Sequence, residues 1–169
     1  MAMSLAAQTQ AFTNREWKPG TPGITINPAV HYDEAVGAFK VQKGNNDTTL
    51  VITDDQPGVG GNPFQLHGEV KYEGTNDKAY LEMFSRVGGA KLSSQTQGNQ
   101  TVMTKLMGGW RDFVLQVTLT GSSVPANQIE LNAVLPDGGT VWLRNLRLEP
   151  LTGKQSATLS IILGSAAFL

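Results

Sequence analysis

The chain has 169 residues, of which 40% are hydrophobic and 16% are charged, so it can form one domain with a sizeable core and is not a disordered chain. Lys and Arg number 13 against 14 Asp and Glu, so the basic excess expected of a protein that binds nucleic acid or anionic membranes is missing. The absence of cysteine excludes disulfides, thiolate catalysis and thiolate zinc sites.

The first residues form a segment separate from the predicted domain. Residues 1–10 are small and polar, with no basic n-region and no long apolar run, so they are not an intact signal peptide. We expect 1–16 to be a flexible segment, or the remnant of an expression vector or of a cleaved signal. From Trp17 to Pro28, Pro and Gly recur, which predicts an extended stretch at a sheet edge because Pro lacks an N–H donor. Turns are expected at 27–28 and 31–37.

Strands are predicted where apolar and polar residues alternate, or where β-branched residues run together, between turns rich in Gly, Pro and Asp. They cover 38–42, 48–53, 64–72, 79–87, 110–120, 128–135 and 140–148, with a polar loop at 93–101. In the last strand the apolar phase changes near Arg144 and Asn145, which indicates a β-bulge. About seven or eight strands without a long helix predict an all-β domain over 17–151, a β-sandwich of two packed antiparallel sheets.

The last residues are apolar and uncharged. Residues 157–169 follow a polar linker, and 152–169 together are predicted to be a linker and an apolar tail. A bilayer span needs about 20 apolar residues, and this run is shorter. Two interpretations stay open: a final strand or tail that packs on the domain, or a truncated membrane segment.

Several stretches between Phe64 and Pro150 resemble galactose-binding-like jelly-roll domains, the fold of many carbohydrate-binding modules. They are 66–74, 79–84, 110–113, 129–136 and 139–148. In those domains a tryptophan precedes a strand, as Trp110 does here, and a strand of the Gly-Thr-Val-Trp-Leu kind closes the sandwich. The likeness extends to extracytoplasmic domains of uncharacterised bacterial proteins placed before a membrane anchor.

The resemblance implies a jelly roll and an extracytoplasmic location, whether secreted, periplasmic or at the cell surface. It does not imply one ligand, because this fold hosts sugar binders, calcium-only structural modules and protein-contact modules. It also implies that loops in the first part of the chain are where a structural calcium would lie.

The outward positions of the strands offer rings among amide and charged groups. If the strands share one concave sheet, these side chains would bind sugar, because rings stack on the C–H faces of pyranoses while polar groups bind the hydroxyls. The candidate residues are Tyr80, Glu82, Phe84, Arg86, Gln116, Glu130, Asn132, Trp142 and Arg144. Ordinary packing is the commoner role of such aromatics. Trp17 and Trp110 are expected to cap the core and not to bind ligand.

Acidic residues in the turns of the first third are candidate calcium ligands, because calcium takes hard oxygen ligands from loops. They are Asp33, Glu34, Asp47, Asp54 and Asp55. They follow no fixed-spacing calcium loop, and Asp also favours turns for its own backbone hydrogen bonds. The two histidines, His31 and His67, have no paired-ligand spacing and give little support to a metal site or a Ser–His–Asp triad.

Three functions follow from these patterns. The first is a non-catalytic binding module for a glycan, with an accessible face around Trp142. The second is a structural or protein-interaction ectodomain of a membrane-anchored bacterial protein, with no small ligand. The third is a hydrolase that pairs two of Glu69, Glu82 and Glu130, although no feature marks one of them as buried with a raised pKa. We expect the first, and no enzyme; the oligomeric state is not indicated.

Overall fold

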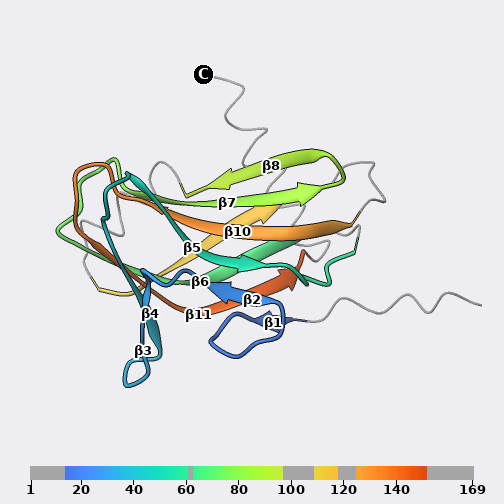
Figure 1. The fold of residues 1–169 in the computed structure, drawn as a ribbon, viewed down its shortest axis with the longest axis horizontal. Helices are drawn as coiled ribbons and strands as arrows, with labels where there is room; N and C mark the ends of the chain where they lie inside the picture. Colours follow the sequence, from blue (N-terminus) through green and yellow to red (C-terminus); the bar gives the residue numbers. More distant parts are fainter. Residues whose placement is uncertain (1–13, 61–62, 97–108, 118–124, 152–169) are drawn as a thin grey trace, which may run out of the picture.

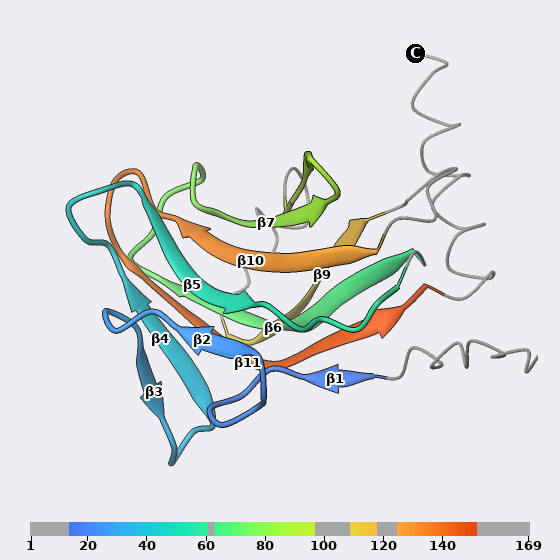
Figure 2. The same ribbon diagram turned by 45° about the vertical axis from the view of Figure 1, so that its right-hand side comes forward.

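The computed structural model describes residues 14–60, 63–96, 109–117 and 125–151. Their strands are β1 Arg15–Glu16, β2 Ile24–Ile26, β3 His31–Asp33, β4 Ala38–Gln42, β5 Thr48–Asp54, β6 Phe64–Glu73, β7 Tyr80–Val87, β8 Ala90–Gln95, β9 Arg111–Val117, β10 Ala126–Val134 and β11 Thr140–Pro150. Sheet A has the order β3-β4-β11-β6-β9, with β1 also pairing with β11, and sheet B has the order β2-β5-β10-β7-β8. The two sheets lie face to face, as Figures 1 and 2 show.

The connectivity is that of a jelly roll. From β4 to β11 the chain passes from one sheet to the other at each connection except β7–β8, whose two strands are neighbours in sheet B. Four of these strands lie in sheet A and four in sheet B, and every pairing is antiparallel. An eight-stranded double sheet of this kind is a jelly roll, so the predicted fold class is confirmed.

The core lies between the sheets and is built from the inward rows that period-2 alternation predicted. On β10, the side chains of Ile129, Leu131 and Ala133 are completely buried, and on β11 Val141 and Leu143 are as well. Burial of one such aliphatic side chain stabilises the fold by about 1.5–3 kcal/mol. The described strands therefore share one continuous apolar layer.

Two short edge strands, β3 and β8, were missed by the sequence prediction, and so was β1, whose residues fall in the segment 1–16 that was expected to be flexible. β8 occupies 90–95, where part of a polar loop was predicted, and β3 occupies part of the predicted turn at 31–37. Both lie at sheet edges, and β8 is largely exposed along its length, so no alternation marks it. The extended edge stretch predicted between Trp17 and Pro28 is correct, because β2 is an edge strand of sheet B.

Some predictions lie outside the described residues. They concern residues 1–13 of the segment 1–16 and the tail at 152–169. They also concern residues 97–101 of the predicted loop at 93–101 and residues 118–120 of the predicted strand at 110–120. Among the residues that are described, no helix has the length and apolar character needed to cross a membrane.

The predicted bulge in β11 is present. Arg144 pairs with Glu69 and Arg147 with His67, so Asn145 and Leu146 together oppose a single residue of β6. Asn145 has a φ of 53°, in the left-handed region that Asn tolerates better than most residues. Along the other side of β11, β4 pairs only before the bulge and β1 only after it. The bulge thus lies at a gap between β4 and β1.

A buried carboxylate fixes the N-terminal segment that contains β1. Asp54, at the end of β5 in sheet B, is completely buried and accepts hydrogen bonds from Arg15 Nε at 2.9 Å and Trp17 Nε1 at 2.9 Å. The Gln56 backbone N–H donates to it as well, at 3.0 Å. Trp17 is itself almost fully buried in the core, as predicted. Asp54, a candidate calcium ligand, is therefore engaged by a guanidinium and an indole.

We predict that Asp54→Ala lowers the free energy of unfolding by about 3 kcal/mol, because removing one partner of a buried ion pair leaves the other uncompensated. Urea denaturation followed by circular dichroism measures the change. Asp55→Ala, at the exposed neighbouring position, is the control and should alter stability by about 0.5 kcal/mol or less. Equal effects of the two variants would contradict a stabilising role of the Asp54 contacts.

A second stability test concerns the backbone at Asn145. Asn145→Val should be less stable than Asn145→Gly by about 1–2 kcal/mol, because a β-branched residue resists positive φ whereas glycine does not. Both variants lose the Asn side chain, so their difference isolates the backbone conformation. Equal melting temperatures for the two would show that the bulge does not hold this φ in solution.

Candidate functional site

The structure divides the predicted ligand-binding residues between two opposite surfaces. The outer face of sheet B carries Tyr80, Glu82, Phe84, Arg86, Glu130 and Asn132, whereas the outer face of sheet A carries Gln116, Trp142 and Arg144. The expectation that one sheet would present them all is wrong. Alternation along a strand separates inward from outward residues, but it does not say to which sheet the strand belongs.

The outer face of sheet B offers few accessible ligand groups. Glu82 and Asn132 are only 9% and 6% exposed, and Gln95 Nε2 donates to the Glu82 carboxylate at 2.7 Å. The Lys91 ammonium lies 3.8 Å from the centre of the Phe84 ring and covers one side of it. Arg86 donates to the Gln128 side chain at 2.9 Å. The polar groups of this face mostly satisfy one another.

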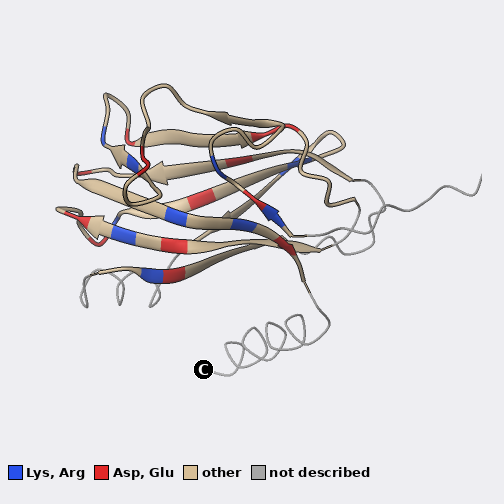
Figure 3. Ribbon diagram, turned by 90° about the horizontal axis from the view of Figure 1, so that it is seen from below, with Lys and Arg blue, Asp and Glu red and all other residues tan. Residues whose placement is uncertain are grey.

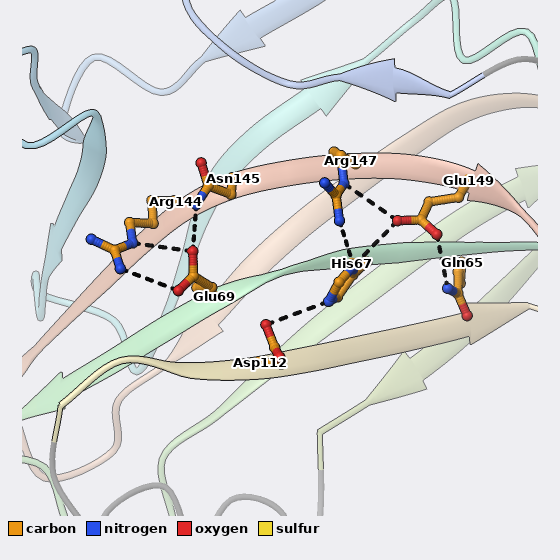
Figure 4. A network of polar contacts seen from close by, with 8 residues as sticks. All are labelled: Gln65, His67, Glu69, Asp112, Arg144, Asn145, Arg147 and Glu149. Carbon is orange, nitrogen blue, oxygen red and sulfur yellow. Dashed lines mark hydrogen bonds and ion pairs between the residues drawn. The ribbon is translucent and has the colours of Figure 1, made fainter.

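The outer face of sheet A carries a row of polar side chains that crosses three adjacent strands, which we call the polar ladder (Figure 4). Its register follows from strand pairing: the outward residues of β11 lie opposite those of β6, and these lie opposite those of β9. Its members are Gln65, His67, Glu69, Asp112, Gln116, Arg144, Asn145, Arg147 and Glu149.

One half of the polar ladder is centred on Glu69. Arg144 donates to its two carboxylate oxygens from Nε at 3.2 Å and from Nη2 at 3.1 Å, and the Asn145 amide donates to it too. The Arg144 hydrogen bond is the main cause that lowers the pKa of Glu69, with the Asn145 bond adding to it against the effect of burial. Glu69 is thus held as a carboxylate, which is the opposite of what a general acid in a hydrolase needs.

The other half of the polar ladder is centred on His67. Gln116 donates to Gln65 at 3.1 Å, and Gln65 donates to Glu149 at 3.2 Å. His67 Nδ1 lies 3.2 Å from Glu149 Oε1 and 3.0 Å from Arg147 Nη2. On the other side of the ring, His67 Nε2 lies 3.5 Å from Asp112. Gln116 of β9 is therefore connected to β11 by two hydrogen bonds through Gln65 of β6.

Next to the ladder, two tryptophans alternate with cations. The Lys71 ammonium lies 5.3 Å from the centre of the Trp142 ring and 5.4 Å from that of Trp110. Lys40 flanks Trp142 at 5.2 Å, and the Arg144 guanidinium stacks 4.1 Å from Trp110. Both rings are half-buried. The prediction that Trp110 caps the core is therefore wrong. Trp110 lies on the outer surface of sheet A, beside Trp142.

A pocket of about 250 Å³, which we call the bulge pocket, opens where β4 and β1 leave β11 uncovered. Its floor is aromatic and apolar, and its rim is polar, the composition typical of small-ligand sites. The floor includes Trp17, Tyr32, Phe39 and Leu146, and the rim includes Glu16, Lys18, His67, Glu69, Asp112, Asn145 and Arg147. The rim shares five residues with the polar ladder: His67, Glu69, Asp112, Asn145 and Arg147.

The candidate calcium ligands do not come together. Asp33 accepts from the Ala35 and Val36 backbone N–H groups at 3.0 and 3.3 Å, Asp47 pairs with Lys43 at 2.7 Å, and Asp55 accepts from Gln128 at 2.7 Å. Glu34 lies exposed in the turn after β3. Within the described part of the chain, no group of three or more acidic or histidine side chains has the geometry to hold a metal ion.

The comparisons with known proteins concern the fold. The structure "HCR/D-Sa-GBL1/C" matches with a TM-score of 0.48 at 9% identity over 80% of this chain and 45% of its own. The botulinum neurotoxin serotype C1 binding domain matches at 0.46 with 12% identity, over 80% and 46%. The family 30 carbohydrate-binding module of the cellulosomal cellulase Cel9D-Cel44B of Clostridium thermocellum matches at 0.44 with 14% identity, over 81% and 91%.

The chain thus spans less than half of the first two of these structures, at 45% and 46% of their length. No protein-family model and no curated protein sequence matches it. At identities of 9–14%, the likeness is one of strand arrangement alone.

Sequence reasoning missed the bulge pocket and the residues Arg147 and Glu149. The signal that could have found them is the phase change at Arg144 and Asn145, since a bulge next to outward charges often marks a site. Tyr32 and Phe39 gave no such signal, because their meeting with β11 depends on tertiary packing.

The lowered pKa of Glu69 predicts a pH-dependent contribution to stability. Its folded pKa lies below the ordinary value of 4.5, so the contribution is present above pH 4.5 and is lost as the pH falls through the folded pKa. Glu69→Gln should therefore be less stable than wild type by about 1 kcal/mol at pH 7, and the difference should shrink at pH 3. Urea denaturation at both pH values measures it. Exposed Glu34→Gln is the control, and an equal pH response of both variants would contradict the prediction.

Proposed function

We propose that this chain is a non-catalytic binding module that holds a carbohydrate on the outer face of sheet A, with the bulge pocket as the centre of the site. The observation that carries the proposal is the pocket itself, in which an aromatic floor meets a rim of hydrogen-bond donors and acceptors. A pyranose has the matching chemistry, because its ring faces are apolar C–H surfaces and its edge is a belt of hydroxyls.

The charges of this face support a neutral polyhydroxylated ligand. Lys71 pairs with Glu73 at 3.1 Å, Arg144 with Glu69 at 3.1 Å, and Arg147 with Glu149 at 3.4 Å. Figure 3 shows basic and acidic positions interleaved along the strands. A strongly charged ligand would have to separate such pairs, whereas hydroxyls can add to them as both donors and acceptors.

The acidic residues around the pocket support binding without catalysis. The pKa of Glu69 is lowered by Arg144, and the pKa of Glu16 is lowered by its hydrogen bond from Lys18. Glycoside hydrolysis needs one carboxylic acid with a raised pKa near a second carboxylate. The other two candidate glutamates, Glu82 and Glu130, lie on the opposite sheet. A module that binds polysaccharides would act outside the cytoplasm, and this location is part of the proposal.

Isothermal titration calorimetry against cellohexaose, xylohexaose, laminarihexaose, mannohexaose and galactohexaose tests the proposal. We expect saturable binding of at least one of them by the wild type. Trp142→Ala and Tyr32→Ala should each weaken it about tenfold, since loss of one ring contact costs roughly 0.5–1.5 kcal/mol beyond the area it buries. Phe84→Ala, an aromatic truncation on the outer face of sheet B, is the matched control and should bind like wild type.

Two results would contradict the proposal in different ways. If Phe84→Ala loses binding while Trp142→Ala and Tyr32→Ala bind like wild type, the site lies on sheet B instead. Binding of no oligosaccharide would leave the structural or protein-interaction ectodomain as the leading function.

A further inference from the structure

Two contacts at one nitrogen of His67 exclude each other. Arg147 Nη2 lies 3.0 Å from His67 Nδ1, and because a guanidinium only donates, this hydrogen bond needs Nδ1 without a proton. Glu149 Oε1 lies 3.2 Å from the same atom, and because a carboxylate only accepts, that hydrogen bond needs Nδ1 with a proton. The proton state of His67 therefore decides which neighbour it holds.

The surroundings of His67 are mixed in charge. Arg147 and Glu149 face it from β11, Asp112 faces it from β9, and Gln65 and Glu69 lie beside it on β6. In the neutral ring with a bare Nδ1, the proton is on Nε2, which lies 3.5 Å from Asp112 Oδ1. In the charged ring, Nδ1 carries a proton that Glu149 can accept, and the Asp112 carboxylate lies 3.5 Å from Nε2. The charged ring is thus next to two carboxylates, but only the neutral ring offers Nδ1 as an acceptor to Arg147 Nη2.

Arg147 also belongs to the bulge pocket. It lines the rim together with Glu16, and Arg147 adds, after the larger effect of Lys18, to the lowering of the Glu16 pKa. Its side chain is 43% exposed, so it has room to move. A guanidinium released from His67 therefore remains next to the pocket, between Glu149 and Glu16.

We propose that Arg147 is a ligand-contacting residue of the bulge pocket and that His67 is its positioning residue, holding Arg147 back when neutral and releasing it when protonated. The ligand-contacting role rests on the function proposed above. Protonation removes the acceptor for Arg147 Nη2 and adds a like charge beside it, so the guanidinium turns toward the pocket and donates to a ligand oxygen.

The first experiment needs no ligand. Nuclear magnetic resonance of the full chain at pH 8.5 and 5.5 should show His67 with its proton on Nε2 at the higher pH. The Arg147 guanidinium signals should shift between the two values in wild type and should not shift in His67→Gln, whose amide oxygen can still accept from Arg147. The chain has two histidines, so His31→Gln completes the assignment and should retain the Arg147 shift. Two results would overturn the positioning role of His67: a proton on its Nδ1 at pH 8.5, or Arg147 guanidinium signals that do not shift between the two pH values in wild type.

The second experiment measures binding of the five hexaoses by calorimetry at the same two pH values. Wild type should bind about fivefold more tightly at pH 5.5 than at pH 8.5, the lower range of coupling between linked sites. His67→Gln should lose this pH dependence, Arg147→Lys should bind weakly at both values, and His31→Gln should behave like wild type. Binding that is independent of pH in wild type would overturn this inference and leave the proposed function standing. Binding of no hexaose would overturn the proposed function and the ligand role of Arg147, while the ligand-free experiment alone decides the role of His67.

Discussion

The outer surface of sheet A depends on the β-bulge in β11, where two residues lie opposite one residue of β6. Asn145 and Leu146 together oppose Gly68, because Arg144 pairs with Glu69 and Arg147 pairs with His67. A Cβ at Gly68 would lie 2.6 Å from Leu146 Cδ2 and 2.9 Å from Phe113 Cε1, so any larger residue would force these two buried side chains to move. The bulge keeps the residues on both sides of it in the correct phase, with Leu143 and Leu146 inward and Arg144 and Arg147 outward. Because of the bulge, β11 contributes side chains to the core on one face and to the polar ladder on the other, both before and after the bulge.

The wall of the bulge pocket depends on a second constraint, the contacts that Asp54 of sheet B makes with the segment containing β1. β1 has only two residues paired with β11, too few to fix the segment by backbone hydrogen bonds alone. Asp54 supplies the missing attachment from sheet B, since it binds Arg15 and Trp17 on the two sides of Glu16. The backbone N–H of Trp17 in turn donates to the backbone carbonyl of Leu146 at 2.9 Å, within the bulge. The N-terminal segment thus links the two sheets and closes one side of the pocket.

Periodicity predicted the strands whose inward residues are aliphatic, because burial of one face enforces alternation. Ile129, Leu131 and Leu135 are examples, and the phase change at Asn145 located the bulge. It missed β8, an edge strand held to β7 by backbone hydrogen bonds that no side-chain pattern reports. It also placed Trp142 and Phe84 on one face, although they lie on opposite sheets, because strand order is a property of the whole chain. Trp110 was misassigned for a related reason: its partners Lys71 and Arg144 come from β6 and β11.

A cross-strand ladder of charges stabilises an antiparallel sheet even when it binds nothing, so its presence alone does not indicate a ligand site. The two halves of the polar ladder differ in this respect. Around Glu69, Arg144 Nε and the Asn145 amide share Oε2 while Arg144 Nη2 donates to Oε1, so all three donors are satisfied at once. Around His67, Arg147 and Glu149 compete for one nitrogen, and a purely structural pair would gain from resolving that competition in favour of one partner. The half around His67 also borders the aromatic floor of the bulge pocket, where a ligand oxygen would replace Nδ1 as the acceptor for Arg147 Nη2 once the ring is protonated.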